Sequence, residues 1–140
     1  MARRYWIMKT EPSAYSFDDL VREGSTEWDG VRNYQARNNM REMSVDDLVL
    51  IYHSVGPKDF VGVARVSVEA HPDSTTDDER WECVDIEPVK ALEVPVNLAT
   101  VKADAKLEDI ALVKHSRLSV APLTAPEFRH LLKLGKTKLD

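Results

Sequence analysis

Five consecutive apolar residues, LVLIY at positions 48–52, restrict the folds that are open to this chain. Neighbouring side chains of a strand point to opposite faces, so the first, third and fifth of these would lie on one face and the second and fourth on the other. A strand that is apolar on both faces needs cover on both. The run therefore predicts a strand over residues 47–53, placed at the centre of a sheet or in a barrel wall that a helix covers.

Further strand-like segments flank this one. A turn at residues 56–59 joins it to the next segment, so the two are expected to form a hairpin. Gly62 in that next segment suggests a bend of the kind that a barrel needs. The other strand-like segments cover residues 5–10, 60–70, 81–89, 90–96 and 117–121.

Helix signals lie between and after these strands. Ser16 and Asp19 have the spacing of a capping box, and Gly24 ends the helix that they begin. Thr124 and Glu127 have the same spacing at the start of a last helix. Three more helical segments are expected, at residues 33–43, 97–103 and 106–112.

The order of these segments indicates the fold class. The strands pair as adjacent hairpins and not as regular βαβ units, which favours an α+β fold: a small, mostly antiparallel β-barrel with peripheral helices. A length of 140 residues fits a single domain over residues 1–140. With 43% hydrophobic and 31% charged residues, the composition is that of a globular domain.

The net charge of −5 is unevenly distributed along the chain. Residues 69–113 carry 12 acidic against 4 basic residues, whereas residues 114–140 carry 2 acidic against 6 basic ones. A chain with a pI near 5.4 does not grip long stretches of duplex by charge alone. It could still contain a pocket for one base or nucleotide.

Signals for cofactors and metals are missing from the sequence. Its five glycines form neither of the common phosphate-binding motifs, and its four histidines lack metal-ligand spacing, so we expect no cofactor and no metal. The single cysteine, Cys83, allows no internal disulfide and fits a reducing compartment. Because there is neither a secretory signal nor an apolar run of about 20 residues, we expect a cytoplasmic location.

The segment WDGVRNYQARNN, at positions 28–39, has the most promising mixture of side chains. Trp28 and Tyr34 could stack on an unstacked base, and Asn33 could hydrogen-bond its edge. Arg37 could hold a phosphate. The alternative is equally good at this point: Trp28 belongs to the core, Asn33 caps a helix, and the arginines form a solvated face.

Smaller candidates lie at the ends of strands. Lys9 could contact a phosphate or pair with Glu11 at the surface. Tyr15 could line a pocket. Arg117 and Ser119 share one face of the late strand, where they could complete a pocket rim or simply be exposed.

The neighbours His53 and Ser54 suggest nucleophilic catalysis at first sight. Adjacent residues of a strand point to opposite faces, so the two do not readily form a catalytic pair with each other. The sequence identifies no other partner for His53, and we do not expect catalysis here.

Several of these segments together resemble the EVE-domain family of the PUA-like superfamily. The resemblance is carried, in order along nearly the whole chain, by YWIMKTEP, YS, WDGVRNYQARN, YHS, GVA, HPD, RLSV and PLT. It implies a PUA-like barrel with a pocket for modified bases of DNA or RNA. In the related YTH domains an aromatic cage holds a methylated adenine.

The resemblance also implies a set of pocket residues. These are Lys9, Tyr15, Trp28, Asn33, Arg37, His53, Ser54 and Arg117, and the side chains themselves add Tyr34 and Ser119. One departure affects the cage. The loop over residues 72–80, expected to be mobile and acidic, has no aromatic residue, although Trp81 directly after it could replace the second cage wall.

We therefore expect a monomeric nucleic-acid-binding module that recognises a modified base, on a single strand or flipped out of a duplex, and is not an enzyme. One alternative is a hydrolase of a modified nucleoside, as among the related ASCH proteins, with Lys9, Thr10 and Glu11 as the reacting groups. Another is a protein-interaction domain whose acidic middle segment faces a basic partner.

Overall fold

The computed structural model describes residues 3–139 and shows a mixed α+β fold. The described residues contain six strands and several short helices, so the predicted α+β class is confirmed. The elements in order are β1 (Tyr5–Thr10), α1 (Phe17–Glu23), β2 (Thr26–Glu27), α2 (Tyr34–Arg41), β3 (Leu48–His53), β4 (Asp59–Pro72), β5 (Glu82–Asn97), α3 (Leu98–Ala103), the 3-10 turn η1 (Ala105–Leu107), α4 (Ala111–Lys114), β6 (Val120–Leu123) and α5 (Ala125–Leu134).

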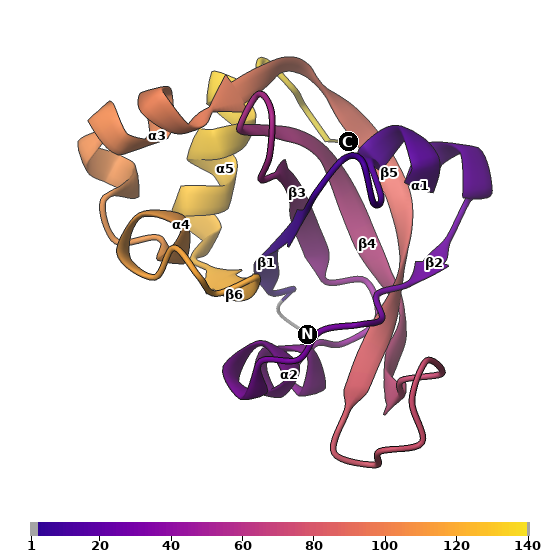
Figure 1. Ribbon diagram of the computed structural model, residues 1–140. Coiled ribbons are helices and arrows are strands. Elements are labelled where there is room, and N and C mark those ends of the chain that lie inside the picture. Colours follow the sequence, from indigo (N-terminus) through magenta and orange to yellow (C-terminus); the bar gives the residue numbers. More distant parts are fainter. Residues whose placement is uncertain (1–2, 140) are drawn as a thin grey trace.

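The strands form one sheet in the order β2-β5-β4-β3-β1-β6 (Figure 1). Within residues 3–139, β1 and β3 pair in parallel and the other four pairings are antiparallel. The expected mostly antiparallel arrangement is therefore present. The expected closed barrel is wrong, because β2 and β6 are the two edges of an open sheet.

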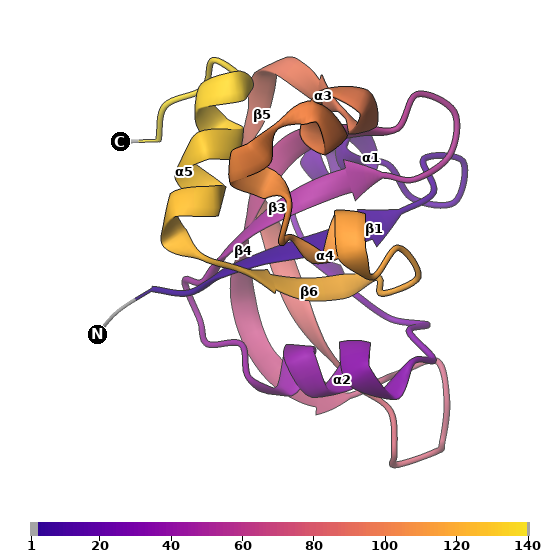
Figure 2. The same cartoon turned by 90° about the vertical axis from the view of Figure 1, so that its left-hand side faces the viewer.

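The central strand β3 is covered on both faces, as its sequence predicts. Val49 and Ile51 belong to a core that includes residues of α1 and α2. Leu48, Leu50 and Tyr52 belong to a second core, on the face of α3, α4 and α5. Figures 1 and 2 show these two groups of helices on opposite sides of the sheet.

Gly62 allows a close approach between α1 and the sheet. A β-carbon at this position would lie 2.4 Å from Cζ of Phe17, the first residue of α1. The pairing of β3 with β4 also shifts register here, between Ile51 and Tyr52. The glycine predicted from the sequence to bend the strand thus gives the Phe17 ring its place on the sheet.

The helix caps match their sequence signals, whereas some strand bounds do not. Both capping boxes are present, and Gly24 has the left-handed backbone expected at the end of α1. The two segments predicted at 81–89 and 90–96 form one strand, β5, because register shifts against β4 allow it to bend without breaking. The late strand begins at Val120, so Arg117 and Ser119 precede it.

Both edges of the sheet are short or interrupted. Strand β2 has only two residues, and β6 contains Pro122, which has no N–H group to donate. The Asn39 side chain of α2 donates to the Val120 carbonyl of β6 at 2.7 Å. Within the described residues, no helix is long and apolar enough to cross a membrane.

Candidate functional site

A cavity of about 600 Å³ opens beside the carboxyl end of β1 and the edge strand β2. Its walls come from three regions: the end of β1 with the turn after it, the segment from β2 to Arg32, and Ser119 directly before β6. One edge strand, β2, and the residue directly before the other, β6, therefore line the same hollow. We call this hollow the first cavity.

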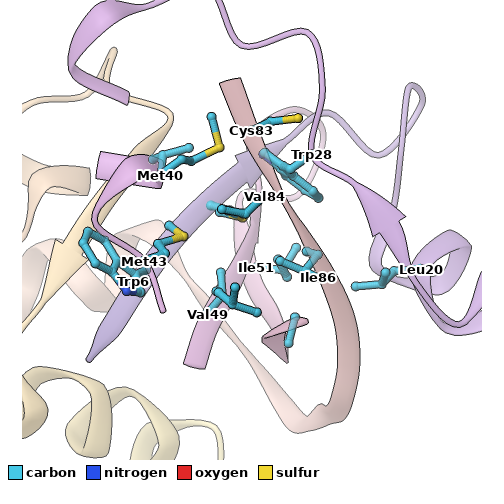
Figure 3. Packing of buried hydrophobic residues seen from close by; sticks show 14 of the residues in the cluster. Trp6, Leu20, Trp28, Met40, Met43, Val49, Ile51, Cys83, Val84 and Ile86 are labelled. Atoms are coloured by element: carbon cyan, nitrogen blue, oxygen red, sulfur yellow. The ribbon is translucent and has the colours of Figure 1, made fainter. Parts of the chain in front are cut away.

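Trp28 forms the aromatic wall of the first cavity while it also packs in the core. Its side chain is 8% exposed, and Figure 3 shows it beside Cys83 and Val84 of the core cluster. The ring of Tyr15 meets the indole edge-on, with centroids 6.3 Å apart, and its hydroxyl donates to Glu23 at 2.8 Å. Burial raises the pKa of Tyr15. Trp28 therefore both packs in the core and lines the cavity, so the two interpretations of this residue are compatible.

The polar floor of the cavity comes from the end of β1. Lys9 Nζ donates to the Ser116 carbonyl at 2.5 Å, and the Lys9 backbone N–H donates to the Ser119 carbonyl at 2.9 Å. Burial lowers the pKa of Lys9. Thr10 Oγ1 donates to the Tyr15 carbonyl at 2.7 Å, which fixes the turn that carries Tyr15.

The buried carboxylate of Asp73 holds the part of the cavity wall that contains Gly30 and Arg32. Asp73 accepts hydrogen bonds from the Gly30 backbone N–H at 2.9 Å, from Arg32 Nη1 at 3.0 Å and from Thr75. Burial alone would raise the pKa of Asp73, but these hydrogen bonds hold it well below its usual range. Gly30 has a positive φ of 78°, which favours glycine at this bend. The start of the β4–β5 loop, expected to be mobile, is therefore a hydrogen-bonded turn that supports the cavity.

The first cavity carries charges of both signs. Lys9 and Arg32 line it together with Glu27 and Asp29. Burial raises the pKa of Asp29, and the nearby charges of Asp73 and Glu27 raise it further. This balance suits a flat polar ligand that both donates and accepts hydrogen bonds better than it suits a bare anion.

A second, smaller cavity of about 340 Å³ adjoins the first, and Lys9, Thr10 and Ser119 line both. It adds Ser54, Arg117 and other residues, and its charged groups are Lys9, Lys58, Arg117 and Glu11. Because basic groups outnumber acidic ones there, this cavity suits an anion.

Asn33 and His53, two of the predicted pocket residues, lie outside both cavities. Asn33 Oδ1 caps α2 by accepting from the Ala36 N–H at 2.8 Å. His53 Nε2 accepts from the backbone N–H of Phe17, at the start of α1, at 3.1 Å. Burial lowers the pKa of His53, which favours the neutral ring that this acceptor role requires. Both side chains position helices.

Tyr34 and Arg37 also lie outside the cavities, in a cluster of their own. The Tyr34 ring stacks on Trp81, with centroids 4.9 Å apart and planes inclined by 22°. The guanidinium of Arg37 lies 4.9 Å from the centre of the Tyr34 ring, and that of Arg32 lies 5.3 Å from the Trp81 ring. We call Tyr34, Trp81 and the arginines around them (Arg32, Arg37 and Arg80) the aromatic stack.

One group of side chains has the composition of a metal site. Potential ligand atoms of Glu27, His71 and Cys83 lie within 4.8 Å of one another, a proximity that the sequence spacing does not reveal. Hydrogen bonds from Ser74 to Glu27 and between His71 Nε2 and Asp85 already occupy this group. Burial and nearby carboxylates raise the pKa of Cys83 to about 12, which opposes the thiolate that a metal would need. The cluster is explained by these internal contacts.

The residues that sequence reasoning missed are mainly those of the cavity wall. Thr26, Gly30 and Asp73 gave no strong signal of their own. The run Asp73-Ser74-Thr75 is typical of a side-chain-to-backbone turn, and it could have indicated an ordered loop. Its contact with Gly30, 43 residues away, depends on how β4 and β5 pair.

Comparison with protein families gives a match over almost the whole chain. A model of the EVE domain matches residues 4–134. Thymocyte nuclear protein 1 of Mus musculus is 33% identical over 168 aligned positions, which cover 96% of this chain and 74% of that protein.

Solved structures agree closely with this fold. Protein Atu2648 of Agrobacterium tumefaciens has a TM-score of 0.94 and 44% identity, covering 96% of this chain and 94% of the other. Human THYN1, crystallised with DNA containing 5-methylcytosine, has a TM-score of 0.90 and 30% identity, covering 97% and 99%. A YTH domain of Zygosaccharomyces rouxii, solved with N6-methyladenosine RNA, shares the fold alone, with a TM-score of 0.60 and 16% identity.

Proposed function

Because this chain belongs to the EVE domain family, we propose that it is a nucleic-acid-binding module whose first cavity accepts one modified base. The observation that carries the proposal is the open hollow of about 600 Å³ beside the Trp28 indole. Its size falls within the range of roughly 300–1,000 Å³ that is usual for small-ligand sites. The human relative crystallised with DNA containing 5-methylcytosine supports the ligand class.

The charges of the two cavities suggest how a nucleotide would be divided between them. The base would stack against Trp28 in the first cavity, near Tyr15 and the Ser119 hydroxyl. Its phosphate would lie in the more basic second cavity, near Arg117 and Ser54. Lys9 lines both cavities and would contact the junction between base and phosphate.

The geometry at Lys9 and Thr10 favours binding over hydrolysis. A nucleophilic threonine needs a base to accept its proton. Here the Thr10 hydroxyl donates to the Tyr15 carbonyl and Lys9 Nζ donates to the Ser116 carbonyl, so each is engaged elsewhere. We propose a binding role, in a cytoplasmic monomer, and expect incubation with an acylated nucleoside to give no hydrolysis product.

The test is a titration of short single strands that differ only in one base, 5-methylcytosine or cytosine. We expect the wild type to bind the methylated strand more tightly. Trp28→Phe should weaken that binding by about threefold, because the smaller ring keeps only part of the roughly 1–3 kcal/mol that stacking on an aromatic residue contributes per base. Ser119→Ala should weaken binding of both strands, because its hydroxyl can hydrogen-bond only the polar edge that cytosine and 5-methylcytosine share.

Thr100→Ala, on exposed α3 across the sheet, is the matched control and should bind like the wild type. Phenylalanine and not alanine is placed at position 28 because the Trp28 indole also belongs to the core. Equal affinity of the wild type for both strands would reject recognition of 5-methylcytosine. Wild-type affinity of both cavity variants would reject the first cavity as the site.

A further inference from the structure

The two large rings of the aromatic stack, Tyr34 and Trp81, pack against each other outside the hydrophobic cores. Neither Tyr34 nor Trp81 belongs to, or packs against, the two hydrophobic cores. The Tyr34 side chain is 50% exposed, although an aromatic residue of this size stabilises a fold mainly when it is buried. The pair joins the start of α2 to the end of the β4–β5 loop, which Figures 1 and 2 both show beside α2.

Positive charge surrounds these rings. Arg37 donates to the Asn38 side-chain oxygen and to the Arg80 carbonyl at 2.9 Å, which are neutral acceptors that leave its charge unbalanced. Arg80 pairs with Asp78 and also approaches the Tyr34 hydroxyl at 3.3 Å. In a protein with a net charge of −5, an exposed ring flanked by guanidinium groups is a local exception.

The stack is continuous with the first cavity. Arg32 lines that cavity, and its guanidinium lies 5.3 Å from the centre of the Trp81 ring. Asp73 fixes Arg32 in this position through a hydrogen bond of 3.0 Å to Nη1. A strand that places one base in the cavity would therefore pass Arg32 and reach Tyr34 with a neighbouring base.

We infer that the aromatic stack is a second subsite, which binds the nucleotide next to the modified base of a single strand. The inference rests on the proposed function for the position of the first base. Tyr34 supplies a ring on which any base can stack, and Arg37 supplies the charge for its phosphate. The subsite is therefore indifferent to sequence and to modification, in contrast to the cavity.

The experiment compares tetradeoxynucleotides that contain one 5-methylcytosine or one cytosine with the corresponding mononucleotides. Tyr34→Ala should weaken both tetranucleotides by about tenfold, since base stacking is insensitive to the identity of the base. It should leave the shifts that 5-methyldeoxycytidine monophosphate causes in NMR spectra unchanged. Arg37→Gln should make the negative slope of log affinity against log salt concentration shallower by about 0.7, because one single-strand phosphate contact is lost.

Two controls keep the result specific. Tyr34→Phe retains the ring and should bind like the wild type, which separates stacking from the contact between the hydroxyl and Arg80. Arg129→Gln changes an exposed residue of α5, across the sheet, and should leave the salt slope unchanged. Circular dichroism should show all variants folded.

The outcomes separate this inference from the proposed function. Equal binding of methylated and unmethylated tetranucleotides, both weakened by Tyr34→Ala, would retain the stack and reject base recognition by the cavity. Wild-type affinity of Tyr34→Ala for both tetranucleotides would overturn the second subsite, even with a clear preference for the methylated strand. Failure of the wild type to bind any tetranucleotide would overturn it as well.

Discussion

The first cavity offers the Trp28 ring to a ligand, and the aromatic stack offers the Tyr34 ring, which stacks on Trp81. The two regions build these rings into the molecule differently. Trp28 is 8% exposed and packs in a core, whereas Trp81 packs against neither core. In the cavity, the atoms that would recognise a base also hold the fold together. In the stack, these two tasks are separate, so the stack can change with little cost in stability.

The largest expected effect tests this difference directly. Trp28→Ala should lower the free energy of unfolding by about 3–5 kcal/mol, because it leaves a hole in a packed core. Tyr34→Ala should lower it by only about 1 kcal/mol, the contribution of an exposed aromatic pair. Urea denaturation of both variants measures the contrast, and similar losses would show that the two regions are built alike.

Asp73 connects the two regions, so its removal should affect both. Asp73→Ala leaves the Gly30 N–H and Arg32 without their buried acceptor, and it should cost about 1–3 kcal/mol. Because the folded-state pKa of Asp73 is lowered, its contribution is complete above the ordinary value of about 3.9 and is lost as the pH falls through the folded value. Thermal unfolding at neutral and acidic pH would reveal this, and a loss that grew as the pH fell would contradict it.

The smallest expected effect on the free energy of unfolding comes from His71, which contacts Glu27 in the wall of the first cavity. Burial would lower the pKa of His71, but hydrogen bonds to Asp85 and the Pro72 carbonyl, with the charges of Asp85 and Glu27, raise it. Its contribution is therefore complete below the ordinary value of about 6.5 and is lost as the pH rises through the raised value.

The gap in unfolding free energy between the wild type and His71→Gln should thus shrink as the pH increases, by less than about 1 kcal/mol because the pair is partly exposed. Chemical denaturation at several pH values measures this gap. A gap that widened with increasing pH would show that His71 is bound in its neutral form.

Local signals explain which parts of the fold could be predicted from the sequence. The capping boxes and the doubly apolar β3 act over a few residues, and each appears where the sequence indicates. Barrel closure depends on whether β2 and β6 meet, which no local pattern encodes. The single strand β5 contains Pro88, a residue that suggests a break unless the partner strand is known to bend with it.

The same distinction applies to the candidate site. The sequence suggests Lys9, Tyr15, Trp28 and Ser119 only as separate side chains, whereas in the structure all four line one cavity. The stacking of Tyr34 on Trp81 could not be predicted, because it joins positions 47 residues apart. Such contacts depend on the path of the chain and not on its composition.

The short and interrupted edge strands affect how readily the sheet can pair with strands of other protein chains. An unclosed sheet exposes backbone groups to which a foreign strand can add, the usual route to aggregation. Here β2 offers two residues, Pro122 interrupts β6, and Asn39 already occupies the Val120 carbonyl. The open sheet therefore presents few free backbone groups with which a foreign strand could pair, although its two edges do not meet.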